Sequence, residues 1–197
     1  MNMLFILFVH LTTLLPMEKE YEIATLGGGC FWCTEAVYEK IEGVKKVVSG
    51  YSGGSRADAV YEKVASGRTQ HAEVIQITFD PDVVDFSEIL EIFWVAHDPT
   101  TLNRQGNDVG PQYRSVIFYH SEEQRIKAER SMKEVAIEIW ETEIVTLLEP
   151  FEAFYKAEDY HQDYYQKVGA RNPYCTFVIT PKLKKIDKIF SDKLKNQ

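Results

Sequence analysis

The chain has 197 residues, of which 45% are hydrophobic and 26% are charged, values that are usual for a globular protein. This length suffices for one domain with a sizeable core and is too short for two full domains. The formal net charge of −8 excludes a general nucleic-acid binder, which needs a basic face. Three cysteines do not make a disulfide scaffold, so catalytic, redox or metal-binding roles are favoured for them.

The first 16 residues form an apolar extension. The stretch from Met3 to Pro16 is shorter than the about 20 residues that a membrane span needs. It has the length of a signal-peptide core, but no Lys or Arg precedes it and no small-residue cleavage site follows. Three interpretations of this extension remain open: a gene start placed too early, with the true start at Met17; an export or anchoring segment; and an ordered part of the fold. We expect residues 17–197 to form a single domain without stable membrane insertion, cytoplasmic unless residues 1–16 are a genuine signal that exports or tethers it.

The predicted elements alternate between strands and helices. Strands show alternating or β-branched residues, and helices show apolar residues at helical spacing. A loop rich in Gly, Pro, Asn and Asp spans residues 97–113, between the helix predicted at 86–95 and the strand predicted at 116–119. An unstructured stretch of this length between regular elements indicates a functional loop. In chain order we predict strands at 21–26, 44–51, 74–79, 116–119, 144–147 and 175–180, and helices at 30–42, 86–95, 122–137, 155–168 and 182–197.

The order of these elements predicts the fold class. Two split βαβ units on a mainly antiparallel sheet favour an α+β fold, a ferredoxin-like plait with an extended C-terminal part wrapped around it.

The most informative stretch is GGGCFWC at residues 27–33. A predicted strand leads into three glycines, and Cys30 stands where a helix begins. Free backbone N–H groups and the positive end of the helix dipole favour a thiolate there. Glycines let the backbone approach whatever the sulfur attacks, and Phe31 and Trp32 suggest an apolar cage for a small uncharged group. We therefore predict that Cys30 is a nucleophile rather than a buried small hydrophobe.

Five motifs together resemble the peptide-methionine sulfoxide reductase A family. In chain order they are GCFWCTEA, VSGYSGG, HAEV, HDPTTLNRQGNDVGPQYRS and YHQDYY, and the resemblance extends from about residue 23 to 175. It implies an enzyme that repairs oxidative damage by reducing the S epimer of methionine sulfoxide, free or in oxidised proteins. It also implies that no cofactor is bound and that thioredoxin, as an external partner, restores the thiols. The sequence does not reveal the oligomeric state, and we expect a monomer by default.

The resemblance assigns roles within this chemistry. Cys30 matches the nucleophile that attacks the sulfoxide sulfur, and Glu73 matches the general acid, whose pKa burial would raise. Tyr61 and Tyr113 match the tyrosines that hydrogen-bond the sulfoxide oxygen. Asp108 matches an aspartate that helps to position the site.

Further residues match supporting parts of the family's site. Phe31 and Trp32 match the pocket for the methyl group of the substrate. His161 belongs to the motif YHQDYY, and we interpret it as a structural residue that braces the site.

Two cysteines compete to resolve the sulfenic acid that the reaction leaves on Cys30. Cys175 resembles the C-terminal recycling cysteine of the family, and we prefer it. Cys33 forms a Cys-x-x-Cys pair with Cys30, a spacing that can close a disulfide. Direct reduction by an external thiol is the third route.

Three other functions compete with this interpretation. A thiol–disulfide oxidoreductase would use Cys30 and Cys33 and would have no use for Glu73 or Tyr113. A binding module would recognise oxidised methionine without turnover. A zinc-binding structural domain would need a second ligand pair beside Cys30 and Cys33, which the sequence lacks, so we expect no metal.

Overall fold

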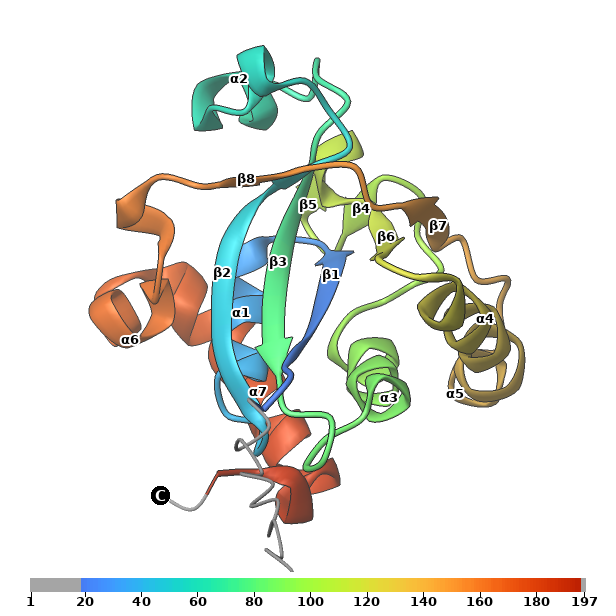
Figure 1. The fold of residues 1–197 in the computed structure, drawn as a ribbon. Coiled ribbons are helices and arrows are strands. Elements are labelled where there is room, and N and C mark those ends of the chain that lie inside the picture. Colours follow the sequence, from blue (N-terminus) through green and yellow to red (C-terminus); the bar gives the residue numbers. More distant parts are fainter. Residues whose placement is uncertain (1–18, 196–197) are drawn as a thin grey trace, which may run out of the picture.

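The computed structural model describes residues 19–195, so the apolar extension at residues 1–16 lies outside the described residues. This part of the chain forms a six-stranded sheet with the order β7-β6-β1-β3-β2-β8 and a separate two-stranded hairpin, β4-β5 (Figure 1). Helices pack against the sheet, which gives an α+β protein. Within residues 19–195, no helix has both the length and the apolar composition needed to cross a membrane.

The centre of the sheet is β1 (Glu22–Gly28). It pairs antiparallel with β3 (Ala72–Phe79) on one side and with β6 (Ser115–Tyr119) on the other. β2 (Val44–Ser52) pairs antiparallel with the far side of β3. These four strands were expected from the sequence, and the hydrophobic core is built on them.

Two short strands extend the sheet at its edges and make it mixed. β7 (Leu147–Pro150) runs parallel to β6, and it begins where the strand predicted at 144–147 was expected to end. β8 (Phe154–Lys156) pairs antiparallel with β2. The latter strand was not predicted, because three residues are too few to show an alternating pattern.

Helix α1 (Phe31–Tyr38) lies behind β2 and β3 and is also covered by the C-terminal helices α6 (Tyr164–Val168) and α7 (Thr180–Ile189) (Figure 1). Seven of its eight residues are buried, because both of its faces are packed. A helix buried all round shows no amphipathic stripe, which explains why its sequence pattern is weak.

Helix α3 (Phe86–Ala96) contacts β1, and helix α4 (Glu122–Ser131) contacts α3 and β6 (Figure 1). α3 begins with a capping box, in which Asp85 and Glu88 each accept a hydrogen bond from the other's backbone N–H. α4 continues through a π-helical turn into α5 (Ile137–Ile139). Both helices were predicted.

The predicted loop at 97–113 contains more structure than expected. β4 (Arg104–Gln105) and β5 (Asp108–Val109) form a small hairpin, and a 3-10 turn, Pro111–Tyr113, follows it. A short helix, α2 (Tyr61–Ala65), was also missed.

Two predictions in the C-terminal part are wrong. The helix expected at 155–168 is confined to α6, because β8 and a 3-10 turn, Asp159–His161, occupy the first half. The strand expected at 175–180 is a π-helical turn, Cys175–Ile179, that runs on into α7. Its β-branched residues suggested a strand, but packing against α1 buries its first and last residues and leaves the middle exposed. The helix predicted at 182–197 begins earlier, at the start of α7, and ends at Ile189.

Candidate active site

Cys30 lies at the end of the central strand and caps the N-terminus of α1. Gly29 makes the sharp turn between them with a φ of +87°, and a Cβ at that position would come within 2.5 Å of Gln105 Cγ. The loop that carries Gln105 therefore packs directly over the turn. The thiol is buried, with 8% of the residue exposed.

Glu73 joins the nucleophile's helix to the neighbouring strand. Its Oε2 accepts a hydrogen bond from the backbone N–H of Phe31 at 3.1 Å, and only 2% of the residue is exposed. Burial raises the pKa of Glu73 to about 8, although the Phe31 hydrogen bond opposes this shift. The carboxyl group therefore holds its proton at neutral pH, beside the first turn of α1.

The thiol of Cys30 is not activated in the way that the sequence suggested. Burial raises the pKa of Cys30 well above its ordinary value, and the interaction with Cys33 adds to this shift. One of the backbone N–H groups expected to favour the thiolate, that of Phe31, is already bonded to Glu73. The same interaction between the thiols lowers the pKa of Cys33 to about 7. Of the two thiols, Cys33 therefore gives up its proton more readily than Cys30.

The two predicted oxygen-binding tyrosines lie near these groups. Tyr61 is the first residue of α2, and Tyr113 ends the 3-10 turn that packs on β3. Burial raises the pKa of both hydroxyls, and the charges of Glu73 and Cys30 raise them further. Both phenols therefore keep their protons and can donate hydrogen bonds.

Trp32 is held in place by three neighbouring side chains. Its ring stacks on Tyr164 with the centroids 3.7 Å apart, and its Nε1–H donates to His161 Nδ1 at 3.1 Å. Tyr174 lies edge-on to it at 6.1 Å. His161, 1% exposed, also contacts the ring of Phe31 at 5.0 Å, so its contacts are those of a bracing residue.

Asp108 is linked to the cysteines through a residue that was not predicted. The hydroxyl of Tyr174 donates to Asp108 Oδ2 at 2.6 Å and lies 3.6 Å from Cys33 Sγ. Asp108 belongs to β5 and Tyr174 to the segment before α7, so this contact connects the loop to the C-terminal wrap. The adjacent Cys175 is wholly buried, with 0% exposed.

A cavity of about 280 Å³ opens beside the two cysteines at the N-terminus of α1. It lies between the β4-β5 hairpin and the C-terminal segment that leads into α7. Cys175 is not among the described residues that line it. The lining residues are Cys30, Cys33, Gln105, Gly106, Asn107, Asp108, Tyr174, Phe177, Val178 and Lys182.

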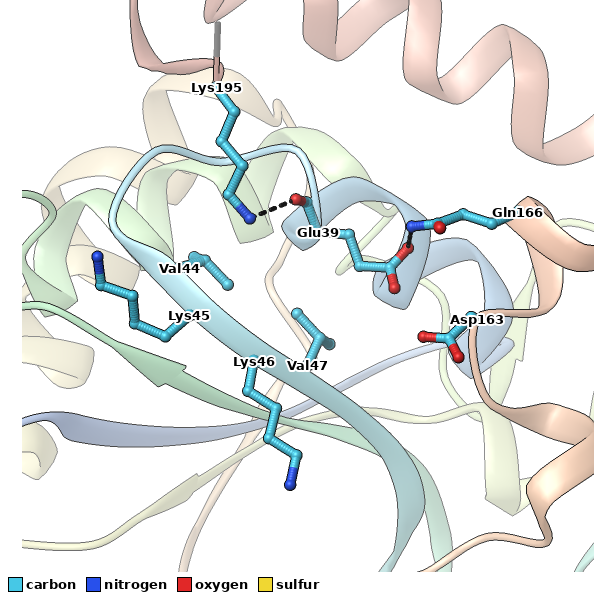
Figure 2. A pocket seen from close by; sticks show the side chains of 8 residues that line it. All are labelled: Glu39, Val44, Lys45, Lys46, Val47, Asp163, Gln166 and Lys195. Carbon is cyan, nitrogen blue, oxygen red and sulfur yellow. Dashed lines mark hydrogen bonds between the residues drawn. The ribbon is translucent and has the colours of Figure 1, made fainter. Parts of the chain in front are cut away.

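A second cavity, of about 260 Å³, lies near the opposite end of α1 and is lined by no cysteine (Figure 2). Gln166 Nε2 donates to Glu39 Oε2 at 3.0 Å, and Lys195 Nζ donates to the carbonyl of Glu39 at 2.7 Å. Among residues 19–195, no group of three His, Cys, Asp or Glu side chains is placed to hold a metal ion.

Comparison with known proteins identifies the family. The family model described as "Peptide methionine sulfoxide reductase" matches residues 22–194. The chain belongs to this family. It is 60% identical over 174 residues to "Peptide methionine sulfoxide reductase MsrA" of Saccharolobus solfataricus, a match that covers 88% of this chain and 97% of that protein. The protein of the same name from Sulfolobus acidocaldarius is 58% identical over 172 residues, 87% of this chain and 97% of its own length.

Solved structures of methionine sulfoxide reductases are similar to the structure of this chain. "Methionine sulfoxide reductase A of Corynebacterium diphtheriae" is 33% identical and superposes with a TM-score of 0.66 over 78% of this chain and 77% of that one. The reduced form of Mxr1 from Saccharomyces cerevisiae is 36% identical, with a TM-score of 0.65 over 75% of this chain and 85% of that one.

Reasoning from the sequence missed two residues that hold this family member's site together. Glu158 accepts hydrogen bonds from the Tyr51 hydroxyl and from the backbone N–H of Tyr61, both at 2.9 Å, and so fixes the start of α2. Tyr174 was overlooked because the Asn-Pro-Tyr-Cys stretch was interpreted only through Cys175. A tyrosine directly before a candidate cysteine was the available signal.

Proposed function

We propose that this protein reduces the S epimer of methionine sulfoxide, free or in oxidised proteins, to methionine. The observation that carries the proposal is the buried, protonated Glu73, which accepts a hydrogen bond from the Phe31 backbone N–H directly after Cys30. A carboxyl group that keeps its proton at neutral pH can protonate a leaving or developing oxygen. The family relationship supports the same reaction.

The first step is the transfer of the sulfoxide oxygen to Cys30. Because its pKa of about 7 leaves Cys33 partly ionised at neutral pH, Cys33 can accept the proton that Cys30 gives up as its own thiolate forms. The thiolate attacks the sulfoxide sulfur, and Glu73 protonates the oxygen while Tyr61 and Tyr113 donate hydrogen bonds to it. The methionine sulfur is reduced by two electrons, and Cys30 becomes a sulfenic acid. Phe31 and Trp32 enclose the substrate methyl group.

Cys33 is the resolving cysteine that the geometry supports best. It lies on the first turn of α1, its backbone N–H bonds to the Cys30 carbonyl at 3.0 Å, and both thiols line the same cavity. Cys175, which the sequence favoured, is not among the described residues that line this cavity. A disulfide between Cys30 and Cys33 would then be reduced by thioredoxin, without a bound cofactor.

We also propose a finer fold assignment, a ferredoxin-like split βαβ plait built from β1-α1-β2-β3-α3-β6. The order β6-β1-β3-β2 with antiparallel neighbours throughout supports it. The C-terminal part from β7 onward extends and wraps this plait. We propose residues 17–197 as a single catalytic domain that acts as a monomer in the cytoplasm.

Stereospecific turnover tests the proposed function. The S and R epimers are supplied separately with dithiothreitol or thioredoxin to the wild type, Cys30→Ser and Glu73→Gln. We expect the wild type to consume only the S epimer and Cys30→Ser to be inactive. Full activity of Cys30→Ser would refute the assignment.

The same samples distinguish the other functions. A thiol–disulfide oxidoreductase would reduce a disulfide substrate, would lose that activity in Cys33→Ser and would retain it in Glu73→Gln. A binding module would bind the S epimer without releasing methionine. A zinc-binding structural domain would carry zinc when its metal content is measured.

A further inference from the structure

The contacts of Tyr174 indicate a function for this residue beyond packing. Its hydroxyl has one proton, and the short 2.6 Å contact assigns that proton to Asp108 Oδ2. The hydroxyl oxygen then has free lone pairs on the side of Cys33 Sγ, 3.6 Å away, which is within the range of a hydrogen bond to sulfur. Cys33, Tyr174 and Asp108 therefore form a chain in which each group can donate to the next.

We propose that Tyr174 and Asp108 form a proton relay that removes the thiol proton of Cys33 as Cys33 attacks the sulfenic acid on Cys30. This proposal rests on the proposed function, in which Cys33 resolves the sulfenic acid. It assigns Asp108 to the second half of the cycle, after methionine has formed.

The step balances in atoms and electrons. The S–H bond of Cys33 and the S–O bond of Cys30 break, and a disulfide bond forms between the two sulfurs. Cys33 sulfur is oxidised by one electron and Cys30 sulfur is reduced by one. The Cys33 proton moves to the Tyr174 oxygen while the Tyr174 proton moves to Asp108. Glu73 gave up its proton in the first step, so the departing hydroxide takes a proton from water in the cavity and leaves as water, and Asp108 returns one proton to that water.

The relay operates in concert because Tyr174 cannot ionise by itself. Burial raises the pKa of Tyr174, and the neighbouring charges of Cys30 and Cys33 raise it further. The hydroxyl must therefore accept one proton as it gives up another. The acceptor at the end, Asp108, lines the 280 Å³ cavity and can return its proton to water there.

The surroundings of Cys33 favour the loss of its proton. Lys182, on α7, lines the same cavity, and its positive charge acts with the Cys30 interaction to lower the pKa of Cys33 to about 7. The negative charge of Asp108 opposes this effect, so protonation of Asp108 during the relay removes the opposition. The titratable groups that shift the pKa of Cys33, or whose pKa Cys33 shifts, are Cys30, Glu73, Asp108, Tyr174, Cys175 and Lys182.

A single-turnover experiment tests the relay. The fully reduced protein is mixed with the S sulfoxide without a reductant, and samples are quenched over time. Released methionine reports the first step, the Cys30–Cys33 disulfide detected by mass spectrometry reports the second, and a dimedone adduct on Cys30 reports the sulfenic acid between them. The variants are Tyr174→Phe, which keeps the ring beside Trp32, and Asp108→Asn, which keeps an acceptor oxygen but loses the charge.

Tyr165→Phe is the matched control, because it removes a hydroxyl of the same C-terminal part that bonds only to Thr180 Oγ1, at 3.0 Å. We expect Tyr174→Phe to slow disulfide formation at least tenfold relative to methionine release, so that the dimedone adduct on Cys30 accumulates. The pH at which disulfide formation is half-maximal should rise, since Cys33 must then lose its proton to water. Asp108→Asn should slow disulfide formation in the same way but without the rise in the half-maximal pH, because the Asp108 charge that raises the pKa of Cys33 is lost. Tyr165→Phe should match the wild type.

Three other outcomes would overturn, respectively, the relay, the resolving role of Cys33 and the proposed function. Disulfide formation at the control rate in both Tyr174→Phe and Asp108→Asn, with an unchanged pH profile, would overturn the relay alone. Methionine release without a Cys30–Cys33 disulfide in the wild type would overturn both the relay and the resolving role of Cys33. No methionine release by the wild type would overturn the proposed function itself. If Tyr174→Phe does not fold, Asp108→Asn decides the question, because the aromatic packing stays intact.

Discussion

The backbone N–H of Phe31 donates to Glu73 Oε2 at 3.1 Å, so the helix that begins at the nucleophile is tied to a carboxyl group on the neighbouring strand. The register of the sheet explains this contact. β1 and β3 run antiparallel and pair Leu26 with Ile75, so Glu73 comes to lie beside the end of β1. The acid and Cys30 are thereby fixed by the same strand pair, whose backbone hydrogen bonds keep their separation constant.

Replacing Glu73 should slow methionine formation and change its pH dependence. Glu73→Gln keeps an acceptor for the Phe31 N–H but cannot give up a proton. General acid catalysis contributes roughly 100- to 10,000-fold, so we expect a loss of that order in the single-turnover rate. The wild-type rate should fall as the pH rises through about 8, where Glu73 loses its proton, and Glu73→Gln should lack this decline.

Glu35→Gln controls for the removal of a buried carboxyl group from the same region. Glu35 is 1% exposed and bonds to Ser49 Oγ at 3.0 Å, away from the thiols. It should retain the decline in rate near pH 8. If the rate of Glu73→Gln still falls near pH 8, the decline is caused by a group other than Glu73.

Removing the ring of Trp32 should weaken catalysis through the loss of an apolar wall. A methyl-sized apolar contact changes kcat/KM by roughly 10- to 200-fold, and we expect Trp32→Ala to fall in that range. Trp32→Phe keeps a ring against Tyr164 but loses the hydrogen bond to His161, so its loss should be smaller. Steady-state kinetics with the S sulfoxide measures both.

Trp140→Phe is the control for these variants. It also loses an indole hydrogen bond, of 2.9 Å to the Trp94 carbonyl, at the far end of α5. Equal losses in Trp32→Phe and Trp140→Phe would mean that the Trp32 effect reflects general destabilisation.

The sequence could predict the elements around Cys30 because their signals are local. The strand at 21–26 alternates, the glycines end it, and the strand at 74–79 stops at Asp80-Pro81. The segment after Tyr174 could not be predicted in this way. Its residues have strand propensity, and only packing against α1, which is 140 residues away in sequence, selects the helical form.

The electrostatics of the site also depend on distant parts of the chain. The helix N-terminus at Cys30 suggested a thiolate, but that prediction used only the residues next to Cys30 in the sequence. Burial and the neighbouring Cys33 reverse it, and burial cannot be derived from the seven-residue motif alone. Tyr174, which links Asp108 to Cys33, is 66 positions from Asp108 and 141 from Cys33, so this link becomes visible only in the folded chain.

Cys33→Ser and Cys175→Ser should separate the two candidates for resolution of the sulfenic acid. Cys33→Ser should release one equivalent of methionine and then stop when thioredoxin is the reductant. Cys175→Ser should continue to turn over, because Cys175 does not line the cavity that Cys30 and Cys33 share. Multiple-turnover assays with thioredoxin, followed by peptide mapping of the disulfide, measure this. Continued turnover of Cys33→Ser together with arrest of Cys175→Ser would restore Cys175 as the resolving residue.

Glu39, in the second cavity, should make the stability of the protein depend on pH (Figure 2). Burial raises the pKa of Glu39 to about 7, and the charge of Glu35 adds to the shift. In the unfolded state Glu39 has the ordinary glutamate pKa of about 4.3. Between this pH and about 7, the folded state therefore holds a proton that the unfolded state has released. The free energy of unfolding contributed by this group is fully present at low pH and is lost as the pH rises through about 7.

Glu39→Gln should remove this loss, because the amide can still accept the hydrogen bond from Gln166 but cannot ionise. We expect the variant to gain stability relative to the wild type at pH 8 and to differ less from it at pH 5. Urea unfolding at both pH values measures the change. Glu42→Gln, which removes the same charge from an exposed position, is the control. A gain at pH 8 of equal size in both variants would attribute the effect to net charge rather than to the half-buried carboxyl group of Glu39.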